Sequence, residues 1–216
     1  MKKIFCLIFF IVLAAYHIQA KEKTIVIYST NDVHGSITNF AKIARFIQNE
    51  RKQNPNILVL NGGDIFSGNP IVDQHAQQGL PMIELMNQIE YDYGVFGNHE
   101  FDYGTESMFA LLNSGRLPVT CLNLRSCATG KRPFSPFIMR TYGTKRVAFI
   151  GVVTPNTLYS ESYAFYDELG RQEYELCPNT LHQEVQEAAN QARKAGADYV
   201  VVLAHLGEAK NSLRAD

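Results

Sequence analysis

Short apolar runs alternate with amphipathic stretches along most of this chain. The runs have the length of buried strands, and between them apolar residues recur three and four positions apart, the period of a helix with one buried face. The expected strands span residues 24–28, 57–60, 94–96, 119–122, 137–141, 146–153 and 199–203. The expected helices span residues 40–54, 81–89, 105–112 and 178–195. Three strand–helix pairs followed by a hairpin predict an α/β fold with mixed sheets.

Two local features refine this prediction. Thr105 is expected to cap the helix that follows it, because threonine is a favoured residue at that position. Residues 156–177 are polar and aromatic without a clear period, and they are expected to be irregular. Hydrophobic residues make up 46% of the chain and charged residues 19%, so a buried core is expected.

The first 20 residues have the pattern of a cleavable secretory signal peptide. Two lysines precede an uncharged apolar run, Ile4–Ala15, and a more polar stretch then ends at Ala20. The alternative is an uncleaved anchor, but the run is short for a membrane span. We therefore expect a signal peptide at residues 1–20, one domain at 21–216, and export to the periplasm or the cell surface. No later segment is long and apolar enough to cross a membrane.

Net charge and cysteine content narrow the possible partners. The formal net charge is −1 and no basic stripe stands out, so binding of long nucleic acid is not expected. Removal of the signal peptide would leave three cysteines, an odd number for an exported protein. Cys121 and Cys127 could close a small loop, or all three, including Cys177, could be free.

Polar residues follow the first two strands, where α/β folds place their functional groups. Asp32 and His34 lie two positions apart, so in an extended chain they would face the same way and could grip a metal ion. Asp64 follows two glycines, which allow a sharp turn, and its carboxylate could bridge two cations. Taken singly, these residues could equally be turn aspartates and a surface histidine.

The segment Gly97–Gly104, with the sequence GNHEFDYG, is more specific. Asn98 offers a neutral oxygen ligand, and Asp102 lies one turn after His99, where it could accept a hydrogen bond from the ring. Such a bond favours the imidazolium, which can give a proton to a departing alkoxide. The alternative is a helix capped by Asn98 with His99 exposed. His205 also follows a strand, although a single histidine there is more often structural.

Taken together, these motifs resemble the calcineurin-like metallophosphoesterases. The order D-x-H, G-D, G-N-H-E and a further H is that of the family, and GNHEFDYG is similar to the branch of 5′-nucleotidases and 2′,3′-cyclic-nucleotide phosphodiesterases. Residues 150–155 and 205–207 also resemble that branch. The resemblance covers the chain from Lys21 onward. It implies a four-layer α/β/β/α sandwich that holds two divalent metal ions at one end.

The resemblance also implies a ligand set and a mechanism. Asp32 and His34 would hold the first metal, Asp64 would bridge both, and Asn98 and His205 would hold the second. Nitrogen and oxygen ligands of this kind suit Mn, Zn, Fe or Co. A metal-bridging hydroxide would attack the phosphorus of a nucleotide phosphate ester, and His99, oriented by Asp102, would stabilise or protonate the leaving oxygen.

Two parts of the family pattern have no counterpart before Asp216: a downstream glycine-histidine-x-histidine segment and a C-terminal domain that binds the nucleobase. Nothing replaces them, because His17, His75 and His182 are expected to have no role in the site. We therefore expect a C-terminally incomplete domain with an exposed sheet edge and an apolar patch. A fragment is favoured over a chain completed by a separate C-terminal domain or chain, and over a degenerate member.

Three functions stay open at this point. The first is hydrolysis of nucleotide phosphate esters in the manner of a 5′-nucleotidase. The second shares its chemistry and is a 2′,3′-cyclic-nucleotide phosphodiesterase with 3′-nucleotidase activity, or a nucleotide-sugar hydrolase. The third belongs to another class and is a truncated, non-catalytic remnant or binding protein. The sequence does not determine the substrate, the metals or the oligomeric state.

Overall fold

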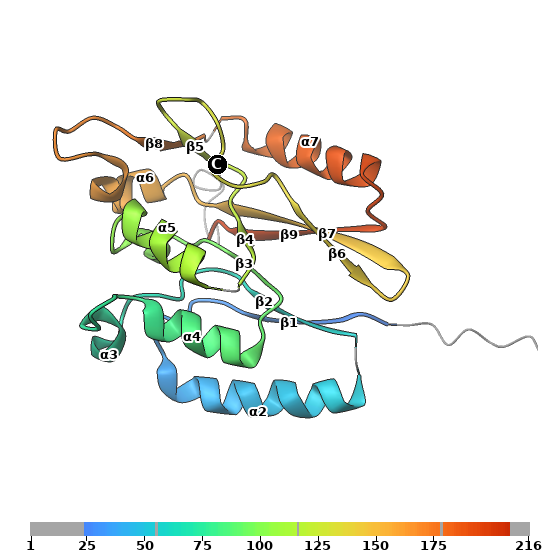
Figure 1. Cartoon of the computed structure of the whole chain (residues 1–216). Helices are drawn as coiled ribbons and strands as arrows, with labels where there is room; N and C mark the ends of the chain where they lie inside the picture. Colours follow the sequence, from blue (N-terminus) through green and yellow to red (C-terminus); the bar gives the residue numbers. More distant parts are fainter. Residues whose placement is uncertain (1–23, 55, 116, 178, 208–216) are drawn as a thin grey trace, which may run out of the picture.

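The computed structural model describes residues 24–54, 56–115, 117–177 and 179–207. Its first sheet is parallel, with strands in chain order: β1 (Val26–Thr30), β2 (Ile57–Asn61), β3 (Tyr93–Val95) and β4 (Val119–Thr120). The connecting helices are α2 (Ile37–Gln53), α3 (Pro70–Asp73), α4 (Leu80–Ile89) and α5 (Thr105–Ser114). The long helices α2, α4 and α5 lie on one side of this sheet (Figure 1). The expected repetition of strand and helix is confirmed.

A second sheet contains β6 (Ile138–Tyr142), β7 (Lys145–Val153) and β9 (Tyr199–His205). Strands β6 and β7 form the expected antiparallel hairpin, and β9 runs parallel to β7. The connection between β7 and β9 carries α7 (Leu181–Lys194), which lies on the opposite side of the molecule from α2 (Figure 1).

Successive side chains of the inner strands point to opposite faces and pack into different layers of the molecule. Leu58 and Leu60 of β2 pack with Val147 and Phe149 of β7 between the two sheets. On the other face of β2, Ile57 and Val59 join the core beneath the helices. On the outer face of β7, Ile150 and Val152 pack with residues of α7. The helices, two sheets and outer helix therefore form the α/β/β/α sandwich, and the predicted fold class is confirmed.

The segment 156–177 is more regular than its composition predicted. It contains α6 (Thr157–Ser160), the 3-10 helix η2 (Ser162–Phe165) and β8 (Tyr174–Leu176). Strand β8 pairs antiparallel with β5 (Leu124–Ser126), which was not predicted, and these two strands form a third sheet. The prediction failed because three-residue strands carry too little sequence for a period to be visible.

Two helix and strand ends also differ from prediction. Thr105 is the first residue of α5 rather than its cap, which is Gly104, and its hydroxyl donates to the carbonyl of Ala164. Strand β4 ends at Thr120, and the N–H of Leu122 donates to the carbonyl of Gly151 instead. In both places a contact with the later half of the chain replaces the local structure that the sequence suggested.

Several predictions concern the ends of the chain and the cysteines. The proposed signal peptide, residues 1–20, lies outside the described residues. No helix within the described ranges is long and apolar enough to span a membrane. All three cysteines of the described residues are free: Cys121 is buried, Cys127 is exposed and Cys177 is intermediate. The Cys121–Cys127 loop is therefore wrong, and the alternative of free cysteines holds.

The outer strands of the two sheets are open along one side. Within the described residues, β1 and β9 each have a neighbour on one side only. Exposed apolar side chains mark both strands, with Ile27 at 45% exposure on β1 and Tyr199 at 53% on β9. A groove lined by both strands, with Leu58 and Val147 at its base, opens between them. The expected exposed edge and apolar patch are present.

Candidate metal centre

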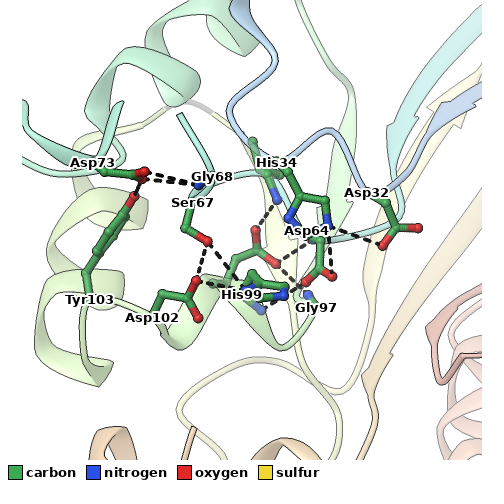
Figure 2. Close-up of polar contacts among 12 residues, drawn as sticks. Asp32, His34, Asp64, Ser67, Gly68, Asp73, Gly97, His99, Asp102 and Tyr103 are labelled. Atoms are coloured by element: carbon green, nitrogen blue, oxygen red, sulfur yellow. Dashed lines mark hydrogen bonds and ion pairs between the residues drawn. The ribbon is translucent and has the colours of Figure 1, made fainter. Parts of the chain in front are cut away.

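The polar residues selected from the sequence meet at one end of the sandwich. Asp32, Asp64 and His99 lie in the segments after β1, β2 and β3, whose carboxyl ends share one edge because the strands are parallel. His205 is the last residue of β9 rather than the residue after it, and it reaches the same place from the second sheet. Figure 2 shows Asp32, His34, Asp64 and His99 turned toward one another.

The turn after β1 is not extended, contrary to prediction. Asp32 and His34 have φ values of 52° and 42°, in the left-handed region. The backbone N–H groups of Asp32 and His34 donate to the carbonyls of Gly63 and Asp64, so this turn follows the turn after β2. Asp32 Oδ1 still lies 3.9 Å from His34 Nε2, so the two side chains converge by this turn geometry and not by strand alternation.

Asp64 is at the centre of the group. Its side chain is 5% exposed, and its Oδ2 lies 3.1 Å from His205 Nε2 and 3.8 Å from His34 Nε2. Its Oδ1 accepts the backbone N–H of His99 at 2.9 Å. Burial opposes ionisation, but the hydrogen bonds from His205 and His99 outweigh it and hold the pKa of Asp64 below its usual value. Asp64 is therefore an anion whose carboxylate contacts residues from several elements.

His205 has one ring nitrogen fixed and one facing Asp64. Its Nδ1 donates to the carbonyl of Gly62 at 2.9 Å, because a carbonyl oxygen can only accept. This leaves Nε2 as the nitrogen that faces the centre, the arrangement usual for a metal-ligating histidine. Burial lowers the pKa of His205, but the Asp64 carboxylate outweighs it and raises that pKa to about 9. In the ion-free protein this imidazole therefore carries a positive charge that compensates Asp64.

Three sets of three candidate ligand atoms occur among the described residues, and Asp64 belongs to two of them. In each set the atoms lie within 4.8 Å of one another; the two sets with Asp64 are His34, Asp64 and His99, and Asp32, Asp64 and His205, and the third is His99, Asp102 and Glu161. Membership of two sets is what a bridging role for Asp64 requires. However, His205 lies beside Asp32, at 4.0 Å, although the family pattern assigns these two residues to different metals.

His99 is the first residue of the 3-10 helix η1 (His99–Phe101), and Asn98 precedes it. Asn98 occupies the N-cap position of this helix, but its side chain makes no capping hydrogen bond, so the capping alternative holds for its backbone position only. The Nδ1–H of His99 donates to Asp102 Oδ2 at 2.8 Å, as predicted from their spacing. Burial lowers the pKa of His99, but Asp102 outweighs it and raises that pKa above its usual value.

Two glycines allow these turns to approach one another. A Cβ on Gly97 would lie 2.0 Å from Asp64 Oδ1, which no side chain could tolerate. Gly63 has a φ of 104°, and a Cβ there would lie 2.6 Å from the nitrogen of Gly97 and 2.8 Å from His205 Nδ1. Any other residue at either position would separate Asp64 from its partners.

Sequence reasoning missed two residues that support the site. Glu100 is 1% exposed; its Oε2 accepts the N–H groups of Asp64 and Gly97, and its Oε1 accepts that of Ile65. Burial raises the pKa of Glu100 to about 7. Glu100 is the last residue of the G-N-H-E motif, but the sequence alone assigned it no role. Ser67, whose hydroxyl donates to Asp102, had no local signal because its partner is 35 positions away.

The donor chemistry fits a divalent metal centre. Imidazole nitrogens and carboxylate oxygens, with an amide oxygen nearby in sequence, are the mixture that Mn, Zn, Fe and Co accept. The orientation of His205 by a backbone carbonyl and the support of the Asp64 turn by Glu100 are typical of residues surrounding a metal site.

Comparison with known proteins identifies one family of related sequences. The sequence profile described as calcineurin-like phosphoesterase matches residues 25–214. The 2′,3′-cyclic-nucleotide 2′-phosphodiesterase/3′-nucleotidase of Haemophilus influenzae is 26% identical over 210 residues, covering 84% of this chain and 31% of that protein. The 5′-nucleotidase of Vibrio cholerae is 30% identical over 163 residues, covering 74% of this chain and 27% of that protein. The chain thus spans about a third of the length of these curated relatives.

Solved structures share the fold. The calcineurin-like phosphoesterase YfkN from Bacillus subtilis superposes with a TM-score of 0.73 at 23% identity, covering 86% of this chain and 63% of that one. The NAD nucleotidase of Haemophilus influenzae superposes with a TM-score of 0.70 at 24% identity, covering 86% and 39%. At these identities the likeness establishes the architecture of the sandwich.

Proposed function

Because this chain belongs to the calcineurin-like phosphoesterase family, we propose that it binds two divalent metal ions and hydrolyses phosphate esters of nucleotides. The observation that carries the proposal is the position of Asp64, which is buried and shared by two of the three sets of candidate ligands. The proposed ligands are Asp32, His34, Asp64, Asn98 and His205. Ions held there would polarise the phosphate and lower the pKa of a water molecule, which supplies the nucleophile.

His99 is proposed to act on the leaving group. Its Nδ1–H is held by Asp102, so the second ring nitrogen is the one free to give a proton. The backbone N–H of His99 is bound to Asp64 Oδ1, which sets the distance between the proton donor and the proposed bridging carboxylate. Asp102 raises the pKa of His99 and so favours its protonated form, which is the form that an acid for an alkoxide leaving group requires.

A second candidate is 2′,3′-cyclic-nucleotide phosphodiesterase and 3′-nucleotidase activity. It is favoured by the relatives of that name, of which the Haemophilus influenzae protein is 26% identical to this chain. The chemistry at phosphorus is the same for both candidates, so they differ only in the ester presented to the site. The same proposal includes a small-molecule nucleotide as the substrate. It also includes a signal peptide at residues 1–20 and export of residues 21–216 to the periplasm or cell surface.

The test begins with the chain from Lys21 onward, reconstituted with manganese or zinc. We expect two metal equivalents per chain, and hydrolysis of AMP or of 2′,3′-cyclic AMP to identify the preferred ester. His99→Ala should lower kcat by about 10²- to 10⁴-fold, the range for loss of a general acid, while the metal content stays the same. His182→Ala is the matched control, because this histidine is exposed on α7.

Two results would overturn the proposal. A protein that binds metal but hydrolyses no phosphate ester would support the non-catalytic alternative. A His99→Ala variant as fast as the parent would remove His99 from the mechanism, even if the metal content were as expected.

A further inference from the structure

Ser67 contacts the pair His99 and Asp102 from a different loop. Its hydroxyl donates to Asp102 Oδ2, the same oxygen that accepts the Nδ1–H of His99 (Figure 2). Ser67 Oγ also lies 3.4 Å from His99 Nδ1. We propose that Ser67 is a positioning residue: it fixes the carboxylate of Asp102 and, through it, the ring of His99. The inference rests on the proposed function, because it concerns how that site is set for reaction.

The segment around Ser67 is anchored on both sides. Phe66, the preceding residue, is completely buried. The N–H of Gly68, the following residue, lies 3.2 Å from Asp73 Oδ1, and Tyr103 donates to that oxygen at 2.5 Å. Since Tyr103 directly follows Asp102 in the chain, the two loops are joined twice, once by Ser67 and once by Asp73 (Figure 2). The backbone on either side of Ser67 is therefore anchored, so the segment cannot shift away from Asp102 without breaking these contacts.

Asp102 depends on this contact more than a buried carboxylate would. Its side chain is 19% exposed, so water can compete for its oxygens. Its backbone is held by Tyr163, whose hydroxyl donates to the Asp102 carbonyl at 2.6 Å, but that contact leaves the carboxylate free to rotate. The second donor, Ser67, removes that rotation and directs Oδ2 toward His99. The tautomer of His99 is therefore set by two residues and not by Asp102 alone.

The same contact joins the metal site to the proton donor. Ser67 lies three positions after Asp64, on a turn whose N–H groups at Asp64 and Ile65 are held by Glu100. A displacement of the Asp64 turn would therefore move Ser67, and with it the carboxylate that orients His99. This arrangement keeps the carboxylate of Asp64 and the imidazole of His99 at a fixed position relative to each other.

The test compares two esters that differ in their need for an acid. Nucleoside alkoxides require a proton on departure, whereas p-nitrophenolate leaves without one. Ser67→Ala should lower kcat for AMP by about 10- to 100-fold, the range for loss of a supporting contact, with KM and metal content unchanged. The loss for p-nitrophenyl phosphate should be much smaller, and Ser67→Thr should restore the AMP rate because it keeps the hydroxyl.

A double-mutant cycle adds a second criterion. Because Ser67 acts through His99, adding Ser67→Ala to His99→Ala should produce no further loss of activity. Equal losses for both esters, full additivity in the cycle, or no loss at all would each overturn the positioning role. The first of these would instead indicate that Ser67 only supports the fold.

A measurement without turnover separates this inference from the proposed function. Nitrogen-15 NMR of the histidine side chains should show His99 protonated at Nδ1 in the parent, and a mixture of tautomers or a faster-exchanging Nδ1–H in Ser67→Ala. If the parent hydrolyses neither ester, the proposed function fails, and the NMR comparison still decides the role of Ser67. An identical His99 signal in both proteins would contradict it.

Discussion

The inner and outer strands contribute to the same site in different ways. All five residues of β2 are buried, and Asp64, which follows it, has a side chain only 5% exposed. Strand β1 alternates between intermediate and exposed residues, and Asp32, which follows it, has a side chain 52% exposed. Both aspartates lie in left-handed turns, with φ values of 56° for Asp64 and 52° for Asp32, but only the turn of Asp64 is also enclosed by packing. We conclude that the half of the centre around Asp64 is prepared before any ion binds.

The largest expected effect comes from exchanging the two aspartates for alanine. Asp64→Ala should weaken metal binding by more than about 100-fold, beyond the range for a supporting residue, and should lower the occupancy of both ions. Asp32→Ala should weaken only one of them. Calorimetric titration with manganese or zinc measures both. Equal losses in the two variants would mean that burial does not distinguish the two halves.

The same comparison applies to apolar side chains. Leu58→Ala, between the two sheets, should cost about 2–5 kcal/mol in the free energy of unfolding, as expected for a fully buried leucine. Ile27→Ala on β1 should cost much less, about 1 kcal/mol or below, because 45% of Ile27 is already exposed. Urea unfolding of both variants is the measurement. If Ile27→Ala matched Leu58→Ala, the outer strand would have to be covered in solution.

A buried and an exposed carboxylate can be compared through the pH dependence of the free energy of unfolding. Glu184, buried at the start of α7, accepts from Arg132 at 2.7 Å and lies 2.9 Å from Arg125. Burial raises its pKa, but the two arginines outweigh this and hold the pKa of Glu184 below its usual value. Its contribution is therefore complete above the unfolded value of about 4.3 and is lost as pH falls through the lower folded value.

Glu184→Gln should lower the free energy of unfolding by about 1–2 kcal/mol at pH 7, and the difference from the parent should shrink as the medium becomes acid. Asp198, exposed at the start of β9, should show a smaller difference when changed to asparagine, although Arg146 and Lys145 also lower its pKa. Urea unfolding at pH 7 and in acid measures both. A difference for Glu184→Gln that grew toward low pH would contradict the assigned sign.

The smallest effect is expected at an exposed thiol. Cys127→Ser should change the free energy of unfolding by less than about 0.5 kcal/mol, as for other surface substitutions. In the parent, Cys127 should react with a thiol reagent at once, whereas Cys121, whose pKa is raised to about 12 by burial, should react only on unfolding. Mass spectrometry of the labelled peptides distinguishes them. Rapid labelling of Cys121 would show that the inner core opens.

The sequence predicted most of the fold because the long elements have clear periods. Strand β2 and helix α7 could be placed from apolar spacing alone, and the motifs after β1, β2 and β3 selected Asp32, Asp64 and His99. Strands β5 and β8 could not be found in this way, since each has three residues. Ser67 and Glu100 were missed for another reason. Their roles depend on distant partners, and neither spacing nor composition records which loops meet.

The hydrogen bond of His205 to a residue far away in the sequence has a consequence for the order of events in folding. Its Nδ1 bonds to the carbonyl of Gly62, 143 positions earlier, and the bond exists only when β9 has docked beside β7. Contacts of such long sequence separation form slowly. A chain emerging from the ribosome therefore carries Asp32, Asp64 and His99 well before His205. Metal binding that involves His205 should follow the docking of β9, and the rate of metal uptake would report how quickly β9 pairs with β7.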